Sequence, residues 1–135
     1  GATIPPGLFT MSNVVKLIAL DDNNLQGTVP TEIGYMTLLG TLHLQNNGLA
    51  GTIPSELGLV TSLQWLDVTN NHFSGEIPVQ IANWVRSYLL MSSNDLEGVI
   101  PAAICDRLEN NSLFLEVDCE EVYCVNNASR VLQCG

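Results

Sequence analysis

The stretch LHLQNNGLAGTIPSELGLVTSLQWLDVTNNHFSGEIP, residues 42–78, contains one pattern of leucine, asparagine, glycine and proline twice, 24 residues apart. The same pattern recurs on both sides of it. Prolines at five positions are separated by 24, 24, 24 and 23 residues (Pro6, Pro30, Pro54, Pro78 and Pro101). An asparagine and a glycine precede each of the last four prolines at constant offsets (Asn23, Asn47, Asn71, Asn94; Gly27, Gly51, Gly75, Gly98). Repetition at this period indicates a repeat architecture.

Each residue type in the pattern has a physical role. Before every asparagine stands an apolar-x-apolar pair, which predicts a short strand with one buried face (Ile18/Leu20, Leu42/Leu44, Leu66/Val68, Leu89/Met91). The asparagine can donate and accept hydrogen bonds inside a turn, glycine permits a sharp bend, and proline fixes φ. Segments such as SELGLVTS return the chain as short helical turns. One coil cannot bury its own apolar side, but coils stacked about 4.8 Å apart can, which predicts a solenoid.

These columns resemble the plant-type leucine-rich repeat, whose 24-residue consensus is LxxLxLxxNxLxGxIPxxLGxLxx. The resemblance covers residues 1–117 and implies an α/β fold: a right-handed horseshoe of about five coils, the first one incomplete. It also implies a parallel β-sheet on the concave face, a second short sheet from the Gly-x-Ile-Pro segments, and helical or 3-10 returns on the convex face. The coil that follows Pro78 is one residue shorter, and we expect Trp84 or Val85 to replace its usual leucine.

Charge and hydropathy exclude several function classes. Lys and Arg total 4 against 14 Asp and Glu, so the net charge is -10 and the basic surface of a nucleic-acid binder is missing. Eight of the acidic residues lie from Asp95 onward, which disfavours anionic ligands and anionic membranes at that end. No apolar run reaches the roughly 20 residues that span a bilayer, so this segment is not expected to insert into a membrane. The abrupt start GATIPP predicts a mature product or an excised fragment. Either the preceding sequence has been removed, which we favour, or residues 1–10 fold over the open end of the solenoid.

All four cysteines lie in the last 31 residues, with spacings that match no zinc site (Cys105, Cys119, Cys124 and Cys134). They predict two disulfides formed in an oxidising compartment, in any of three pairings, and these would fasten a C-terminal cap over residues 105–135. The cap is similar to those of secreted or surface leucine-rich repeat proteins from diatom-like algae. Asn110 and Asn127 begin glycosylation sequons, which is consistent with an extracellular glycoprotein.

The sequence nominates no enzyme, metal site or cofactor. The two histidines, His43 and His72, belong to different columns, and no Gly-x-Ser-x-Gly motif or phosphate-binding loop is present. The acidic pairs Asp21-Asp22 and Glu120-Glu121 are adjacent in sequence. Neighbours on a strand point to opposite faces, so these pairs make poor acid/base partners.

The predicted binding surface is the concave face, where residues flanking the buried pairs form three columns. The first column is expected to run Leu17, Thr41, Trp65, Tyr88, Ser112; the second Ala19, His43, Asp67, Leu90, Phe114; the third Asp21, Gln45, Thr69, Ser92, Glu116. An exposed aromatic patch on a rigid sheet is typical of protein-binding hot spots. We expect seven residues to contact the partner: Trp65, Tyr88, Leu90, His43, Asp67, Gln45 and Phe114.

The leading hypothesis is a monomeric, non-catalytic recognition module that binds a protein or a glycan. In the glycan version, Trp65 and Tyr88 stack on sugars while Asp67 and Gln45 bond hydroxyls. The resemblance also implies receptor ectodomains and inhibitors of cell-wall-degrading enzymes. A structural or adhesive segment of a longer solenoid is the alternative. Ice binding is disfavoured because the column after each glycine, Thr28, Thr52, Glu76, Val99, loses its threonines after two coils.

Overall fold

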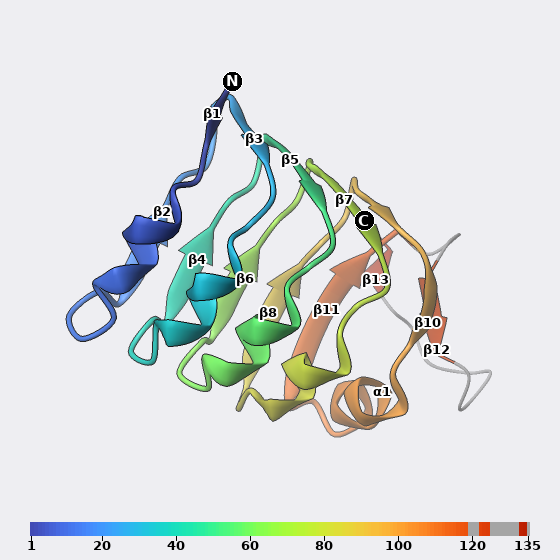
Figure 1. Cartoon of the computed structure of the whole chain (residues 1–135). Coiled ribbons are helices and arrows are strands. Elements are labelled where there is room, and N and C mark those ends of the chain that lie inside the picture. The colour runs from blue at the N-terminus through green and yellow to red at the C-terminus, as the bar shows by residue number, and fades with distance from the viewer. Residues whose placement is uncertain (119–121, 125–132, 135) are drawn as a thin grey trace.

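The computed structural model describes residues 1–118, 122–124 and 133–134, the last two segments mainly by their backbone. The coils that start at Leu17, Thr41 and Trp65 each contain a strand of a long sheet, a turn, a strand of a second sheet and a short 3-10 helix (Figure 1). The strands and helices, in chain order, are β1 (Ala2–Thr3), η1 (Pro6–Thr10), β2 (Leu17–Ala19), β3 (Leu25–Gly27), η2 (Thr31–Tyr35), β4 (Thr41–His43), β5 (Gly48–Gly51), η3 (Ser55–Leu59), β6 (Trp65–Asp67), β7 (His72–Gly75), η4 (Val79–Asn83), β8 (Ser87–Leu90), β9 (Asp95–Leu96), β10 (Gly98–Ile100), α1 (Ala102–Glu109), β11 (Leu113–Val117), β12 (Val122–Cys124) and β13 (Gln133–Cys134).

The solenoid follows from strictly parallel pairing between equivalent strands of successive coils. The concave sheet has the order β13-β11-β8-β6-β4-β2, and the second sheet has the order β1-β3-β5-β7-β9. Figure 1 shows these strands side by side, with the 3-10 helices stacked along the other side of each coil. The register Thr41↔Trp65 reproduces the 24-residue period of the sequence. The leucine-rich repeat solenoid predicted from the repeat is therefore confirmed.

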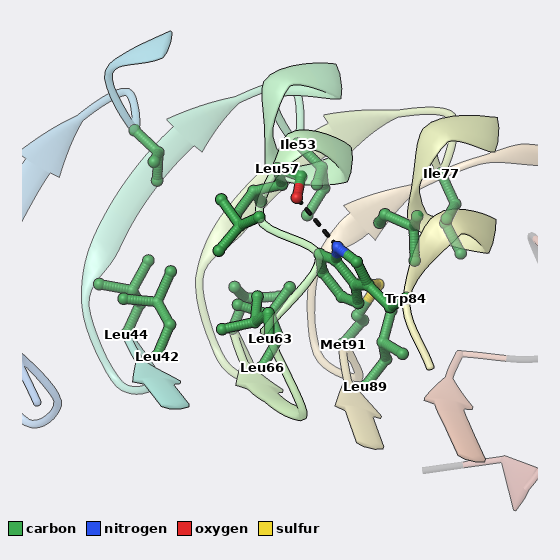
Figure 2. Close-up of a cluster of buried hydrophobic side chains, with 14 of the residues drawn as sticks. Leu42, Leu44, Ile53, Leu57, Leu63, Leu66, Ile77, Trp84, Leu89 and Met91 are labelled. Carbon is green, nitrogen blue, oxygen red and sulfur yellow. Dashed lines mark hydrogen bonds between the residues drawn. The ribbon is translucent and has the colours of Figure 1, made fainter. Parts of the chain in front are cut away.

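The core is formed by the apolar pairs that defined the repeat. Leu42, Leu44, Leu66 and Val68 point inward from the concave sheet and are fully buried. The 3-10 helices close the core from the opposite side with one apolar side chain each, such as Leu57 (Figure 2). Because every coil repeats this arrangement, the core is a continuous column rather than a single central cluster.

A ladder of asparagines satisfies the backbone at the turn between the two sheets. Asn71 is buried; its Oδ1 accepts a hydrogen bond from the Leu49 backbone N–H at 3.0 Å. Its Nδ2 donates to the carbonyls of Leu44 and Val68, also at 3.0 Å. Asn47 and Asn94 make the equivalent bonds one coil away on each side. Each asparagine thus joins two coils, which is why the column recurs.

The glycine and proline columns shape the corner of each coil. The glycines that precede the corners have φ of 79°, 80°, 76° and 92° (Gly27, Gly51, Gly75 and Gly98), a region that a Cβ disfavours. Pro30, Pro54 and Pro78 then cap the 3-10 helices with φ between -61° and -69°. The carbonyl of Pro54 accepts a hydrogen bond from Leu57, so the corner leads directly into the helical turn.

The shortened coil keeps its core by inserting a larger side chain. Trp84 is completely buried and Val85 is 70% exposed. Trp84 follows η4 as Met36 follows η2 and Val60 follows η3, so a larger ring occupies this column of the core in the shortened coil. Its indole Nε1 donates a hydrogen bond of 2.9 Å to the Leu57 carbonyl of the preceding coil (Figure 2). Arg86 has a φ of 47°, an uncommon conformation for a non-glycine residue.

The two ends of the solenoid differ. At the start, β1 pairs with β3, and Phe9 of η1 is buried, so residues 1–10 continue the repeat. In the last coil, the eight-residue α-helix α1 replaces the 3-10 turn and packs beside η4. A disulfide joins Cys105 of α1 to Cys124 of β12. It selects one of the pairs left open by the sequence, while the side chains of Cys119 and Cys134 lie outside the described residues.

Close packing between successive 3-10 helices leaves no room for a side chain at Gly58. A Cβ added there would lie 2.6 Å from the carbonyl oxygen of Gln80 and would also collide with the Gln80 Cβ. We expect Gly58→Ala to lower the free energy of unfolding by about 1–3 kcal/mol, because the backbone of η4 must move. Urea denaturation followed by circular dichroism measures this change.

Gly7→Ala is the matched control, because nothing lies within 4 Å of a Cβ placed at Gly7 in the equivalent helix η1. We expect it to change stability by less than about 0.5 kcal/mol. Equal denaturation midpoints for the two variants would contradict this packing of η3 against η4.

Candidate functional site

Side chains on the outer surface of the concave sheet come from alternate positions of β2, β4, β6, β8 and β11. The first column in the structure is Leu17, Thr41, Trp65, Tyr88 and Phe114, as the strand register shows. Successive side chains in a column are one strand spacing apart, so large rings placed in it contact one another. Residues that are 23 or more positions apart in sequence therefore lie next to each other on the sheet.

Trp65, Tyr88 and Phe114 form an uninterrupted aromatic row. The centroids of the Trp65 and Tyr88 rings are 5.1 Å apart and their planes differ by 27°, which is a stacked arrangement. Tyr88 and Phe114 follow at 5.7 Å and 40°. Trp65 remains 37% exposed and Tyr88 50% exposed, so the row presents apolar surface to solvent.

The sequence placed Phe114 in the wrong column. It was expected beside Leu90, with Ser112 next to Tyr88, whereas Phe114 pairs with Tyr88 and Glu116 pairs with Leu90. Phe114 follows Pro101 by 13 residues, while Trp65 follows Pro54 by 11. The longer helix α1 accounts for the difference, because its extra residues delay the start of β11. This shift adds a third ring to the aromatic row.

The other predicted contact residues lie beside this row. His43, Asp67 and Leu90 share the second column and are half-buried. The His43 ring centroid is 6.4 Å from that of Trp65. Asp67 Oδ1 accepts a hydrogen bond from the Thr69 backbone. Gln45 lies two residues beyond the end of β4, and its enclosed side-chain oxygen accepts no hydrogen bond from any described residue.

The charge of this face is acidic. Asp67, Glu116 and Asp118 are half-buried along its second and third columns. Glu116 accepts a hydrogen bond from Ser92 Oγ, and Asp118 accepts one from the Asn94 backbone. The strands β2, β4, β6, β8 and β11 contain no lysine or arginine. The face therefore favours neutral or cationic partners over polyanions.

Sequence reasoning missed a hollow where β8 and β11 begin. It encloses about 450 Å³ and is lined by Arg86, Ser87, Tyr88, Asn110, Asn111, Ser112, Leu113 and Phe114. Arg86 and Asn110 come from turns of different coils, so no single repeat contains the site. The only signals in the sequence were the deletion before Arg86 and the sequon at Asn110.

No constellation for catalysis or metal binding emerges from the described part of the chain. His43 lies on the concave sheet, whereas His72 is exposed on the second sheet, 3.8 Å from Asp95. Within residues 1–118 and 122–124, no group of three or more His, Cys, Asp and Glu side chains could hold a metal ion. The described helices are also too short or too polar to cross a bilayer.

The structure describes only one of the two predicted glycosylation sequons. Asn110 is exposed at the end of α1, as an acceptor for a glycan must be. Asn127 lies outside the described residues. Whether either residue carries a glycan stays a prediction.

Comparisons with known proteins agree with this geometry. The Leucine Rich Repeat family model matches residues 38–59 and 62–84. The fold is similar to the ectodomain of the Arabidopsis thaliana receptor kinase GASSHO1/SCHENGEN3, solved with CASPARIAN STRIP INTEGRITY FACTOR 2, with 31% identity over 90% of this chain and a TM-score of 0.77. It is also similar to the Arabidopsis receptor kinase HAESA in complex with the peptide hormone IDA and the co-receptor SERK1, with 29% identity over 95% of this chain and a TM-score of 0.78.

The chain corresponds to only part of these proteins, namely 14% of the GASSHO1/SCHENGEN3 chain and 21% of the HAESA chain. It covers 67% of the ectodomain of the Arabidopsis thaliana receptor kinase SOBIR1, at 25% identity over 93% of this chain and a TM-score of 0.74. No curated protein sequence matches this one with significant similarity.

Proposed function

Because the chain is a leucine-rich repeat solenoid, we propose that it is a non-catalytic recognition module of a secreted or cell-surface protein. Its partner binds on the concave face, across the row Trp65, Tyr88 and Phe114. Similar solenoids from plant receptor kinases were solved in complex with a peptide hormone or with CASPARIAN STRIP INTEGRITY FACTOR 2, which supports recognition as the general role. The disulfide between Cys105 and Cys124 supports an extracellular location.

The observation that carries this proposal is the exposed aromatic row on a rigid sheet. Three large rings held in register lose little conformational freedom when a partner covers them, which is why such residues dominate binding energies. Nothing in the core requires these rings to be aromatic, since they point away from it. A role in binding explains their presence better than a role in folding.

A protein partner fits this row better than a glycan does. Glycan stacking needs an open ring face, but Trp65 and Tyr88 turn their faces toward each other at 5.1 Å. The facing ring surfaces are therefore closed to a sugar, whereas protein side chains can pack against the parts of both rings that stay exposed. The half-buried carboxylates of Asp67 and Glu116 beside the row favour a partner segment that carries lysine or arginine.

The double substitution Trp65→Ala with Tyr88→Ala tests the concave face. We expect it to weaken partner binding at least about 30-fold, because hot-spot truncations cost about 2 kcal/mol or more. Partners would first be identified on an array of extracellular proteins and on a glycan array. The affinity of each variant would then be measured by surface plasmon resonance with the purified partner.

Tyr35→Ala is the matched control, since Tyr35 is also an exposed tyrosine, at 65%, but lies on η2 at the convex side. Its affinity should equal that of the unmodified chain. Unchanged binding by the double variant, or an equal loss with Tyr35→Ala, would show that the concave face is not the binding surface.

A further inference from the structure

The hollow at the start of β8 and β11 brings a glycosylation sequon to the end of the aromatic row. Tyr88 and Phe114 line the hollow together with Asn110, Asn111 and Ser112, the three residues of the sequon. Asn110 is exposed at the point where α1 ends. A group attached to its side chain therefore begins at the edge of a space whose wall includes two rings of the proposed binding surface.

Hydrogen bonds hold the sequon in one conformation while leaving its reactive atom free. Asn110 Oδ1 accepts a hydrogen bond of 3.0 Å from the Ser112 backbone N–H. Arg107 donates to Ser112 Oγ at 3.1 Å and to the Ala82 carbonyl, which ties this turn to the preceding coil. The Asn110 Nδ2 atom, to which N-linked sugars attach, donates no hydrogen bond to the described residues.

We propose that Asn110 carries an N-linked glycan whose first sugars occupy this hollow and cover the parts of Tyr88 and Phe114 that line it. The attachment is made by an oligosaccharyltransferase from a lipid diphosphate-linked oligosaccharide. A bond forms between Asn110 Nδ2 and C1 of the first N-acetylhexosamine, the bond between C1 and the diphosphate oxygen breaks, and one Nδ2 proton leaves with the diphosphate. The proposal rests on the extracellular location given under the proposed function.

The lining of the hollow suits a sugar. Tyr88, Leu113 and Phe114 supply its apolar lining, and sugar C–H groups can pack against the parts of the rings that line it. Arg86 and Asn111 belong to its polar lining, and side chains of these types can bond sugar hydroxyls. The glycan would cover only the sides of Tyr88 and Phe114 that line the hollow. A protein partner would meet the remaining exposed parts of these rings together with Trp65.

The test compares the full chain, secreted from a glycosylating eukaryotic host, with Asn110→Gln and Asn111→Gly. The second variant keeps the sequon, and glycine suits the φ of 57° at Asn111. Mass spectrometry of the peptide containing residue 110 should find a glycan on the unmodified chain and on Asn111→Gly. Hydroxyl-radical footprinting should show Tyr88 and Phe114 oxidised severalfold more slowly in those two proteins than in Asn110→Gln. Tyr35, far from the hollow, should react equally in all three.

An unoccupied Asn110, or equal oxidation of Tyr88 with and without the glycan, would overturn the proposal. If Asn110→Gln does not fold, an amidase that converts the glycosylated residue to aspartate supplies the glycan-free form from folded protein. Oxidation of Tyr88 should then rise after the enzyme treatment. None of these measurements needs a partner, so a failure of the proposed binding function would not be mistaken for a failure of this one.

Discussion

Replacement of Trp84 by alanine is expected to lower the free energy of unfolding by about 3–5 kcal/mol. Trp84 is fully buried in the shortened coil, so the truncation opens a cavity between two coils. It also leaves the buried Leu57 carbonyl without the indole N–H that it accepts at 2.9 Å. Urea denaturation followed by far-ultraviolet circular dichroism measures the change, because this signal comes mainly from the backbone and does not use tryptophan fluorescence.

Two further variants separate the causes. Trp84→Phe keeps most of the apolar volume but loses the hydrogen bond, so its loss of stability should lie between those of the unmodified chain and Trp84→Ala. Val85→Ala changes the neighbouring residue, which is 70% exposed, and should cost less than about 0.5 kcal/mol. If Trp84→Ala were as stable as Val85→Ala, Trp84 would not be the side chain that fills the coil.

Asn71→Ala should lower the free energy of unfolding by about 2–4 kcal/mol, although it removes only a small polar side chain. The substitution leaves the Leu49 N–H without its acceptor. It also removes one of two amide donors from the Leu44 and Val68 carbonyls, which keep only those of Asn47 and Asn94. These groups are enclosed between coils, so water cannot easily replace the amide. Thermal and urea denaturation of the variant measure the loss.

Asn23→Ala is the control for this column, because Asn23 occupies the equivalent position at the exposed end of the ladder. Its amide donates to the Leu20 and Asp21 carbonyls, and the side chain is open to solvent. We expect a loss below about 1 kcal/mol. Equal losses at positions 71 and 23 would show that the cost comes from the turn itself and not from the bonds between coils.

The solenoid could be predicted from the sequence because each coil contacts only its neighbours. At a fixed period, asparagine marks the turn, glycine marks the corner and proline marks the start of the 3-10 helix. Nearest-neighbour stacking then leaves one register, which puts Thr41 beside Trp65 and Trp65 beside Tyr88. Two rings of the aromatic row were therefore predictable.

The remaining features depend on segments that do not repeat, and these were decided by tertiary packing. The length of α1 moved Phe114 into the column of Tyr88, and no periodic argument could supply that shift. Packing between the coils places Trp84, and not Val85, in the core of the shortened coil. The proximity of α1 and β12 selected Cys105 and Cys124 among the possible pairs. The hollow at Asn110 exists only where turns of two unequal coils meet. A repeating pattern determines how the coils stack. Residues that depart from the pattern are positioned by the space that the stacked coils leave between them.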